Sequence, residues 1–286
     1  MKILVATDLS PRSDRAIARG YALAQQQKAE MSILYVVDAD LPAELRTHSI
    51  EWARAALAKE AETQAARTGV KATLEVLAGH AKTDIARHAA AIKADLILLG
   101  IHNEAAQPTR RSFAATTAGQ IVKSTRLPIL LVKNEAAQPY GQVVIGVDFS
   151  VYSRAALREA MKLAGSAQYH LVHAYHVPFK GFLGSAETAT EVALDQRLAF
   201  DAFLEDEMDL MEKRGRDGGI APERLNKILR EGEPHRLLPE ECARLSADLL
   251  VIGTHGRTGM SAAIWGSVAT DILNQPPTDV LVVKAY

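Results

Sequence analysis

Three blocks of the 286-residue chain occur twice and in the same order. The matched pairs are residues 3–10 with 143–150, 94–100 with 247–253, and 128–133 with 279–284. Three matched blocks in one order indicate two copies of one fold rather than one large domain. A short polar stretch with a proline and a glycine separates the copies, as in a linker. We therefore expect two domains, residues 1–134 and residues 141–286.

Each copy alternates apolar strand patterns with helical patterns. Several of the strands are apolar throughout, which indicates burial on both faces and hence a parallel sheet. The predicted class is α/β, with two doubly wound domains that each contain a five-stranded parallel sheet covered by helices on both faces. The ligand crevice of such a sheet lies beyond the carboxyl ends of its strands.

The expected elements are clearest in the second copy. Ser150 is expected to cap the first helix there, and Ser10-Pro11 does the same in the first copy. The strands are predicted at 143–147, 170–175, 227–230, 249–252 and 280–283, and the helices at 150–164, 190–214, 236–245 and from Ser267 onward.

Composition excludes several classes of function. Lys and Arg total 33 and Asp and Glu total 34, so a net charge of −1 gives no general attraction for nucleic acid or anionic lipid. No apolar run approaches the roughly 20 residues that cross a bilayer. We expect a cytoplasmic protein with no nucleic-acid and no membrane partner. The one cysteine, Cys242, cannot form an internal disulfide or a thiolate zinc site, and is expected in the core.

The segment after the fourth strand of the second copy is rich in glycine. Gly253 and Gly256 come first, and nine residues later Gly266-Ser267 begins a predicted helix. Glycines let backbone N–H groups converge, and a helix start favours an anion. The spacing favours a phosphate-binding loop over a loop in which glycines only mark turns. The fingerprints of P-loop and dinucleotide-binding proteins are both absent.

At these residues the chain resembles the universal stress protein family, in the tandem form with two such domains. The ATP-binding members of that family carry Gly-x2-Gly-x9-Gly-Ser/Thr, which the second copy matches in full. The resemblance implies ATP as the ligand, with Mg²⁺ as the metal that could accompany it. It also implies an intramolecular pseudo-dimer in which the fifth strands pair, Ile129–Val132 with residues 280–283. Further assembly into a homodimer stays open.

The resemblance also assigns residues to the two ends of the nucleotide. Asp148 and the backbone near Ala174 form the adenosine side, because a carboxylate can accept hydrogen bonds from ribose hydroxyls or the adenine amine. Helix capping is the alternative role for Asp148. Arg257 could add positive charge against the phosphates. The phosphate side consists of Gly253, Gly256, Gly266, Ser267 and Val268.

The first copy departs from this pattern. After Gly100 no glycine occurs until Gly119, and Glu104 places negative charge where phosphates would lie. We predict that the first domain binds no ATP in the family manner.

Other candidate residues are assigned to structure. His170 and His173 alternate faces along a strand, and no cysteine or paired carboxylate near them or His176 completes a metal site. We therefore expect no metal-binding residues. Trp52 and Phe203 are expected in the core, and the acidic run 205–209 on an exposed helix face.

No catalytic residues can be assigned, because no nucleophile triad, Walker-type acid or kinase loop occurs. The favoured hypothesis is a cytoplasmic ATP-binding stress-response protein with a regulatory role, in which ATP orders the loop between Gly253 and Gly266. The alternatives are a slow ATPase, an adenylating or phosphoryl-transfer enzyme, and a nucleotide-independent interaction protein that binds lipid or another small molecule. Extraction of bound ligands would separate them, because nucleotide supports the first and lipid the last.

Overall fold

The structure is a computed structural model that describes residues 1–101, 112–136, 138–177, 186–213, 222–254 and 266–284. Contacts divide the chain into two compact units. The first unit contains Met1–Pro139 and Leu273–Val282, and the second contains Tyr140–Ile272 and Val283–Ala285. The last strand of the second repeat therefore packs mainly with the first unit.

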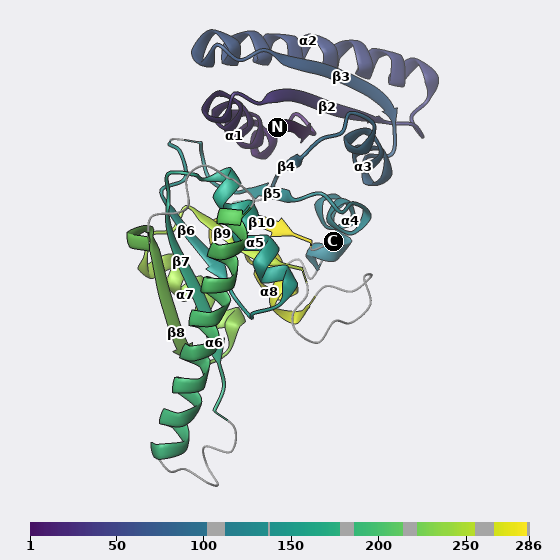
Figure 1. Cartoon of the computed structure of the whole chain (residues 1–286). Helices are drawn as coiled ribbons and strands as arrows, with labels where there is room; N and C mark the ends of the chain where they lie inside the picture. Colours follow the sequence, from purple (N-terminus) through teal and green to yellow (C-terminus); the bar gives the residue numbers. More distant parts are fainter. Residues whose placement is uncertain (102–111, 137, 178–185, 214–221, 255–265, 285–286) are drawn as a thin grey trace. The chain divides into compact units, whose positions relative to one another are not determined.

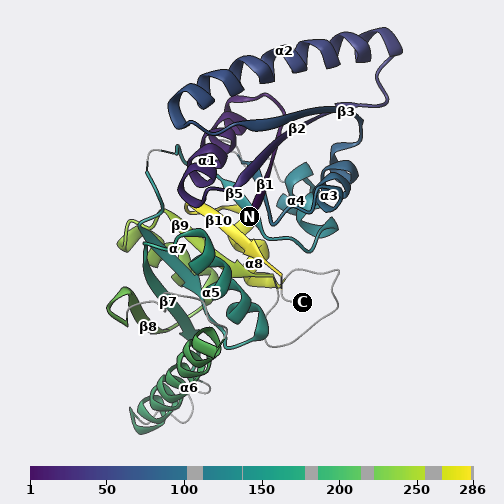
Figure 2. The same cartoon turned by 45° about the horizontal axis from the view of Figure 1, so that its top comes forward.

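The first unit is a doubly wound sheet (Figure 1). Its strands lie in the order β3-β2-β1-β4-β5-β10; the first five are parallel, and β10 is antiparallel to β5. The strands are β1 (Lys2–Thr7), β2 (Glu30–Asp38), β3 (Ala72–Gly79), β4 (Leu96–Gly100), β5 (Ile129–Val132) and β10 (Asp279–Val283). The helices are α1 (Pro11–Gln27), α2 (Ala43–Thr68), α3 (Ala81–Ala91) and α4 (Thr117–Ser124). Figure 2 shows α2 lying along β2 and β3.

The second unit repeats this winding. Its strands lie in the order β9-β6-β7-β8, and the three neighbouring pairs β6·β9, β6·β7 and β7·β8 are parallel. The strands are β6 (Gln142–Gly146), β7 (Gln168–Tyr175), β8 (Leu225–Glu231) and β9 (Leu249–Gly253). The helices are α5 (Val151–Leu163), α6 (Ala186–Lys213), α7 (Pro234–Arg244) and α8 (Ser267–Asn274). The predicted α/β class with two repeated domains is confirmed.

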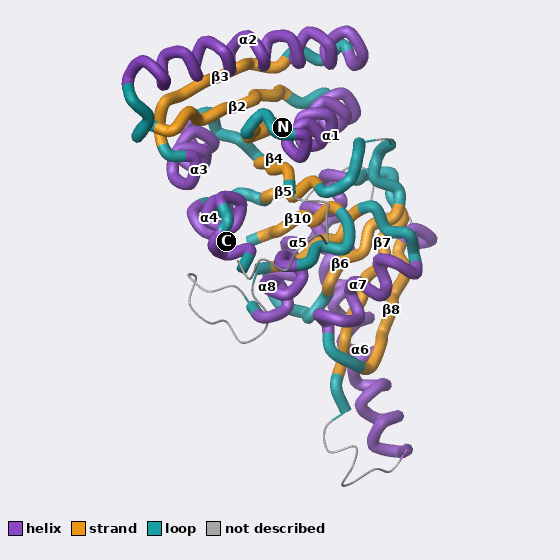
Figure 3. Tube along the Cα trace, turned by 180° about the vertical axis from the view of Figure 1, so that it is seen from behind, coloured by secondary structure: helices purple, strands orange, loops and turns teal. Residues whose placement is uncertain are grey.

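Burial explains why the central strands are parallel. Side chains on both faces of β1, β4, β6 and β9 are buried, which requires helices above and below the sheet. In Figure 3 the strands of each unit lie between helices. The predicted pairing of the two fifth strands is also confirmed, and the structure shows that it is antiparallel, with Leu130 opposite Leu281.

The two helix starts that the sequence predicts differ in detail. The hydroxyl of Ser150 accepts a hydrogen bond from the N–H of Ser153 at 3.3 Å, as expected of an N-cap. Ser10 occupies the N-cap position of α1, ahead of Pro11, but its hydroxyl makes no cap bond. It donates instead to the carboxylate of Asp8. The predicted N-cap position of Ser10 and first-turn position of Pro11 are therefore confirmed, without a hydrogen bond from the N–H groups of α1 to the Ser10 side chain.

Most residues assigned to structure lie where they were expected. His170, His173 and Phe203 are buried, and Cys242 is buried too. Burial raises the pKa of the Cys242 thiol to about 12, which makes it an inert core thiol. Among the described helices, none combines the length and the apolar character that a membrane span needs.

Two of those expectations were wrong. Trp52 is 56% exposed, because the long helix α2 buries only a narrow stripe against the sheet. In the acidic run 205–209, Glu205, Asp206 and Asp209 are exposed as expected, but Glu207 is fully buried. Its carboxylate accepts hydrogen bonds from Arg154 and Arg158 at 2.7–2.9 Å, and these ion pairs connect α6 to α5. A helical pattern alone does not show which acidic residue will face an arginine.

A buried ion pair attaches β10 to the first unit. Asp279 is fully buried, and its Oδ2 lies 3.6 Å from Nε of Arg19, which is 4% exposed. The Oδ1 atom accepts hydrogen bonds from the N–H groups of Lys133 and Asn134, both at 2.8 Å. Removal of one partner of such a pair leaves an uncompensated buried charge, which costs much more than the pair contributes.

We predict that Asp279→Ala lowers the free energy of unfolding by about 3–5 kcal/mol, because Arg19 would stay buried without its counter-charge. Denaturant titration measures the change. Asp271→Ala, at an exposed position of α8, is the matched control and is expected to change stability by less than about 0.5 kcal/mol. Equal effects of the two substitutions would contradict a structural role for the pair.

Candidate functional site

The second unit contains a pocket at the carboxyl ends of its central strands. It is lined by the ends of β6, β7 and β9 and by the first turns of α7 and α8. Six residues that the resemblance assigns to nucleotide binding lie around it: Asp148, Ala174, Gly253, Gly266, Ser267 and Val268. The topology explains this convergence, because parallel strands end at the same edge of the sheet.

Asp148 follows β6 and uses only one of its two carboxylate oxygens within the described part of the chain. Its Oδ1 accepts hydrogen bonds from the backbone N–H of Ser150 at 3.0 Å and from the hydroxyl of Ser150 at 2.6 Å. Asp148 thus holds the capping serine of α5 in place, while Oδ2 is left for another donor. Asp148 therefore does not cap α5 itself but supports the residue that does, and this support uses only Oδ1.

Gly253 has a packing role that the sequence reading missed. A Cβ atom at this position would lie 2.8 Å from Cβ of Tyr152 in α5. In the first unit, a Cβ at Gly100 would lie 2.3 Å from the carbonyl oxygen of Arg12. Both repeats therefore need glycine here for the helix to approach the strand, whether or not a phosphate loop follows.

Gly266 and Thr254 join the two ends of the glycine loop. The N–H of Gly266 donates to the carbonyl of Thr254 at 2.9 Å, and the N–H of Thr254 donates to the carbonyl of Val283 at 3.0 Å. The amide of Gly266 is therefore engaged within the protein. The first turn of α8 begins at Ser267, where backbone N–H groups lack intrahelical acceptors, and it carries no acidic side chain.

Several predicted residues lie outside the described residues. Gly256 and Arg257 belong to the segment 255–265, and Glu104 belongs to the segment 102–111. The predicted effect of ATP on the loop between Gly253 and Gly266 falls on the same undescribed segment.

The first unit has a counterpart of Asp148 whose two oxygens are both engaged. Oδ1 of Asp8 accepts a hydrogen bond from the hydroxyl of Ser13 at 2.6 Å and others from Ser10. Oδ2 accepts from the guanidinium of Arg12, at 3.2 Å from Nε and 2.5 Å from Nη2. Tyr152 takes the place of Arg12 in the second unit, and the hydroxyl of Ser153 there donates to the carbonyl of Ser150 at 3.0 Å. Side chains of the first unit thus donate hydrogen bonds to both oxygens of the Asp8 carboxylate.

The same loop geometry is repeated in both units. Leu9 and Phe149, which follow the two aspartates, have positive φ angles of 57° and 64°. In the second unit the ring of Phe149 stacks on His173, with ring centroids 4.2 Å apart. A ring nitrogen of His173 lies 2.7 Å from the carbonyl oxygen of Val147, next to Asp148. Packing from β7 therefore supports the left-handed turn that presents Asp148.

Sequence reasoning missed the apolar lining of the pocket. Pro234 and Leu238 of α7 contribute to it, together with Val172 of β7 and Ile252 of β9. The place of α7 in the sequence could have predicted this lining, because a helix that follows a parallel strand begins at the carboxyl edge of the sheet.

A repeated doubly wound fold with a pocket at the carboxyl edge is the arrangement in which α/β proteins commonly bind ligands. Comparison with known families makes this specific: the Universal stress protein family matches residues 1–133 and again residues 139–284. The chain belongs to that family, in its tandem form.

Individual relatives are similar over part of their length. Universal stress protein E of Photorhabdus laumondii is 26% identical over 176 residues, which cover 58% of this chain and 54% of the relative. Universal stress protein E of Escherichia coli K12 is 25% identical over 183 residues, covering 59% and 54%. The chain thus matches about half the length of these curated relatives.

Solved structures share the fold across the whole chain. A universal stress protein from Archaeoglobus fulgidus has a TM-score of 0.69 at 17% identity, covering 100% of this chain and 98% of the other. A putative universal stress protein from Pseudomonas aeruginosa has a TM-score of 0.68 at 22% identity, covering 99% and 92%. At these identities the likeness supports the fold alone.

The engaged carboxylate of Asp8 predicts a dependence of stability on pH. Burial alone would raise the pKa of Asp8, but hydrogen bonds from Ser10, Ser13 and Arg12 outweigh burial and hold this pKa well below its usual range. A depressed folded-state pKa stabilises the protein above the unfolded-state pKa of about 4, and this contribution is lost as the pH falls below that value.

We therefore predict that Asp8→Asn lowers the free energy of unfolding at pH 7 by about 0.5 kcal/mol, because the half-exposed ion pair is screened by water. The difference from the unsubstituted protein should shrink progressively as the pH falls below about 4, where Asp8 of the unfolded chain becomes protonated. Denaturant titrations at several pH values measure it. A difference that is constant with pH would contradict the assignment.

Proposed function

We propose that this protein is an ATP-binding regulatory protein of the stress response, with one nucleotide site in the second unit and none in the first. The observation that carries the proposal is the contrast between the two aspartates. Asp148 lines a pocket and its Oδ2 has no donor among the described residues, whereas both oxygens of Asp8 are engaged. A ribose supplies two vicinal hydroxyl donors that would satisfy such an oxygen.

The remainder of the pocket suits the other parts of ATP. Val147, Val172, Leu238 and Ile252 provide an apolar lining against which an adenine ring can pack. The first turn of α8 offers backbone N–H groups and the hydroxyl of Ser267 to the phosphates. Mg²⁺ would accompany the triphosphate through phosphate oxygens and water, as it commonly does.

The described lining favours binding over turnover. It contains one carboxylate and no lysine, arginine or histidine among the residues that the structure describes. Phosphoryl transfer depends on positive charge against the transferred group. We propose that ATP acts as a ligand in the cytoplasm and that its occupancy is read by another molecule.

We predict that ATP binds with one site per chain and that Asp148→Asn weakens it about tenfold, which corresponds to one charged hydrogen bond. Asparagine retains an Oδ1 acceptor for Ser150, so the start of α5 should persist. Isothermal titration with ATP and Mg²⁺ measures both the affinity and the stoichiometry.

The matched control is Asp8→Asn, which alters the equivalent carboxylate of the first unit and should leave ATP affinity unchanged.

The substitution Ser267→Ala is expected to weaken the binding of ATP more than the binding of adenosine, because the Ser267 hydroxyl is on the phosphate side of the proposed site. Two equivalent sites, or equal losses in Asp8→Asn and Asp148→Asn, would overturn the proposal. A lipid extracted from the purified protein in place of nucleotide would favour the interaction-protein alternative.

A further inference from the structure

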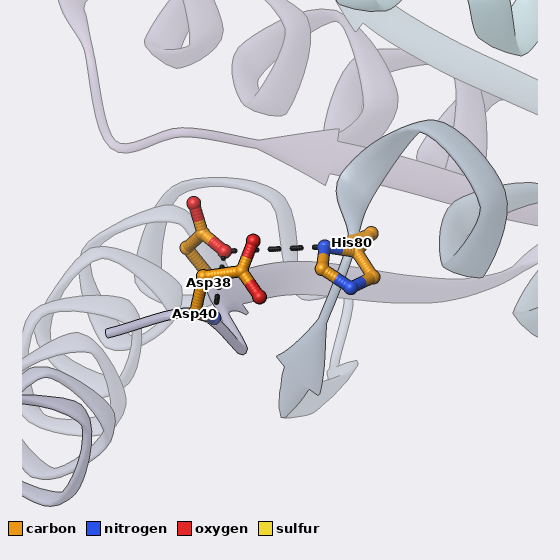
Figure 4. A group of neighbouring side chains, drawn as sticks. All are labelled: Asp38, Asp40 and His80. Carbon is orange, nitrogen blue, oxygen red and sulfur yellow. Dashed lines mark hydrogen bonds and ion pairs between the residues drawn. The ribbon is translucent and has the colours of Figure 1, made fainter. Parts of the chain in front are cut away.

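A second group of side chains at a sheet edge, in the first unit, has no part in the proposed nucleotide site. Asp38 ends β2, Asp40 follows it, and His80 lies between β3 and α3 (Figure 4). All three side chains are exposed, and one ligand atom from each lies within 4.8 Å of the others. Two carboxylates and an imidazole from two separate segments therefore meet at one place.

The backbone fixes these two segments against each other. Asp38 is paired with Gly79 in the β2·β3 ladder, and the N–H of Ala39 donates to the carbonyl of Gly79 at 3.0 Å. The N–H of Asp40 donates to Oδ1 of Asp38 at 3.0 Å, which folds the chain back over the strand end. The sheet pairing thus places Asp38 beside Gly79, the residue before His80, and the turn after β2 places Asp40 next to them.

Local structure does not account for the histidine. His80 occupies the N-cap position of α3, where Ser, Thr, Asp and Asn are the residues that cap well. Its side chain makes no cap bond, and Asp84 instead accepts the N–H of His80 at 2.8 Å. Nδ1 of His80 lies 3.9 Å from Oδ1 of Asp38, beyond hydrogen-bond distance. The imidazole is thus beside a carboxylate without being bonded to it.

Asp40 is similarly unexplained. Its carboxylate makes no hydrogen bond or ion pair with any residue in the described ranges. The nearby guanidinium of Arg46 donates to the carbonyl of Ala39 at 2.9 Å. Two carboxylates and an imidazole, all open to solvent, form a set of donors suited to a cation.

We propose that Asp38, Asp40 and His80 bind a divalent transition-metal ion. Imidazole nitrogen together with carboxylate oxygen suits ions such as Zn²⁺, Co²⁺ and Mn²⁺, whereas Mg²⁺ and Ca²⁺ prefer oxygen alone. Metal–ligand bonds of about 2.0–2.2 Å require the ligand atoms to approach to about 3–3.5 Å, which rotation of exposed side chains achieves. Water completes the coordination on the open side.

The site gives the first unit a ligand of its own. It lies at the carboxyl edge of the sheet, where ligands of doubly wound folds bind, but at β2 and β3 rather than at β1, which precedes Asp8. It also departs from the sequence expectation of no metal-binding residues. That expectation considered histidines close together in sequence, whereas here the β2·β3 pairing brings distant residues together.

Co²⁺ is the probe for the test, because its visible absorption reports inner-sphere coordination. The full-length protein, freed of metal by chelation, is titrated with Co²⁺, and Zn²⁺ or Mg²⁺ is then added. We expect one saturable site per chain that Zn²⁺ displaces and millimolar Mg²⁺ does not. Asp40→Asn and His80→Gln should each weaken Co²⁺ binding at least about tenfold, because each removes a direct ligand.

His48→Gln and Glu44→Gln are the controls, since both residues are exposed on α2 and outside the group. Neither should alter Co²⁺ binding. Asp40 makes no described side-chain hydrogen bond, so Asp40→Asn should fold normally, which thermal unfolding verifies. Unchanged Co²⁺ affinity in His80→Gln and Asp40→Asn, or the absence of a saturable spectrum, would overturn the proposal. The result is independent of ATP binding, because the nucleotide proposal concerns the other unit.

Discussion

The aspartate that follows the first strand of each repeat is the constraint on which the functional account depends. In both units it sits beside a left-handed residue and holds the serine at the start of the next helix. The units differ in what the remaining oxygen contacts. Arg12 neutralises it in the first unit, whereas Tyr152 at the same position in the second unit leaves Asp148 facing a pocket. The difference between Arg12 and Tyr152 on the first turn of this helix thus determines whether the carboxylate is bonded within its own unit or can receive a ligand.

Much of the fold could be predicted from the sequence. The repeated apolar blocks locate the central strands to within one or two residues, because short runs that are apolar throughout are typical of parallel strands buried on both faces. Long half-exposed helices were harder. Trp52 is exposed because α2 buries only a narrow stripe against the sheet. Glu207 is buried because it pairs with Arg154 and Arg158, a tertiary contact that no local pattern contains.

The candidate site was predictable in outline and not in detail. Six of the residues that the resemblance assigns line one pocket, but a glycine in the motif can also be required by packing. Gly253 is required where α5 approaches β9, and its twin Gly100 is required in the unit that lacks the rest of the motif. The apolar lining from α7 and the group formed by Asp38, Asp40 and His80 depend on strand order, which no single segment of sequence encodes. The two repeats therefore share a scaffold while offering different chemistry at its carboxyl edge.

The most direct test of this difference is the number of ATP molecules bound by each chain at saturation. Equilibrium dialysis of the full-length protein against ATP and Mg²⁺ gives that number without assuming a binding model. The account predicts a plateau at one ATP per chain. A plateau at two would show that Arg12 does not close the first unit, and no binding at millimolar ATP would show that the pocket beside Asp148 serves another ligand.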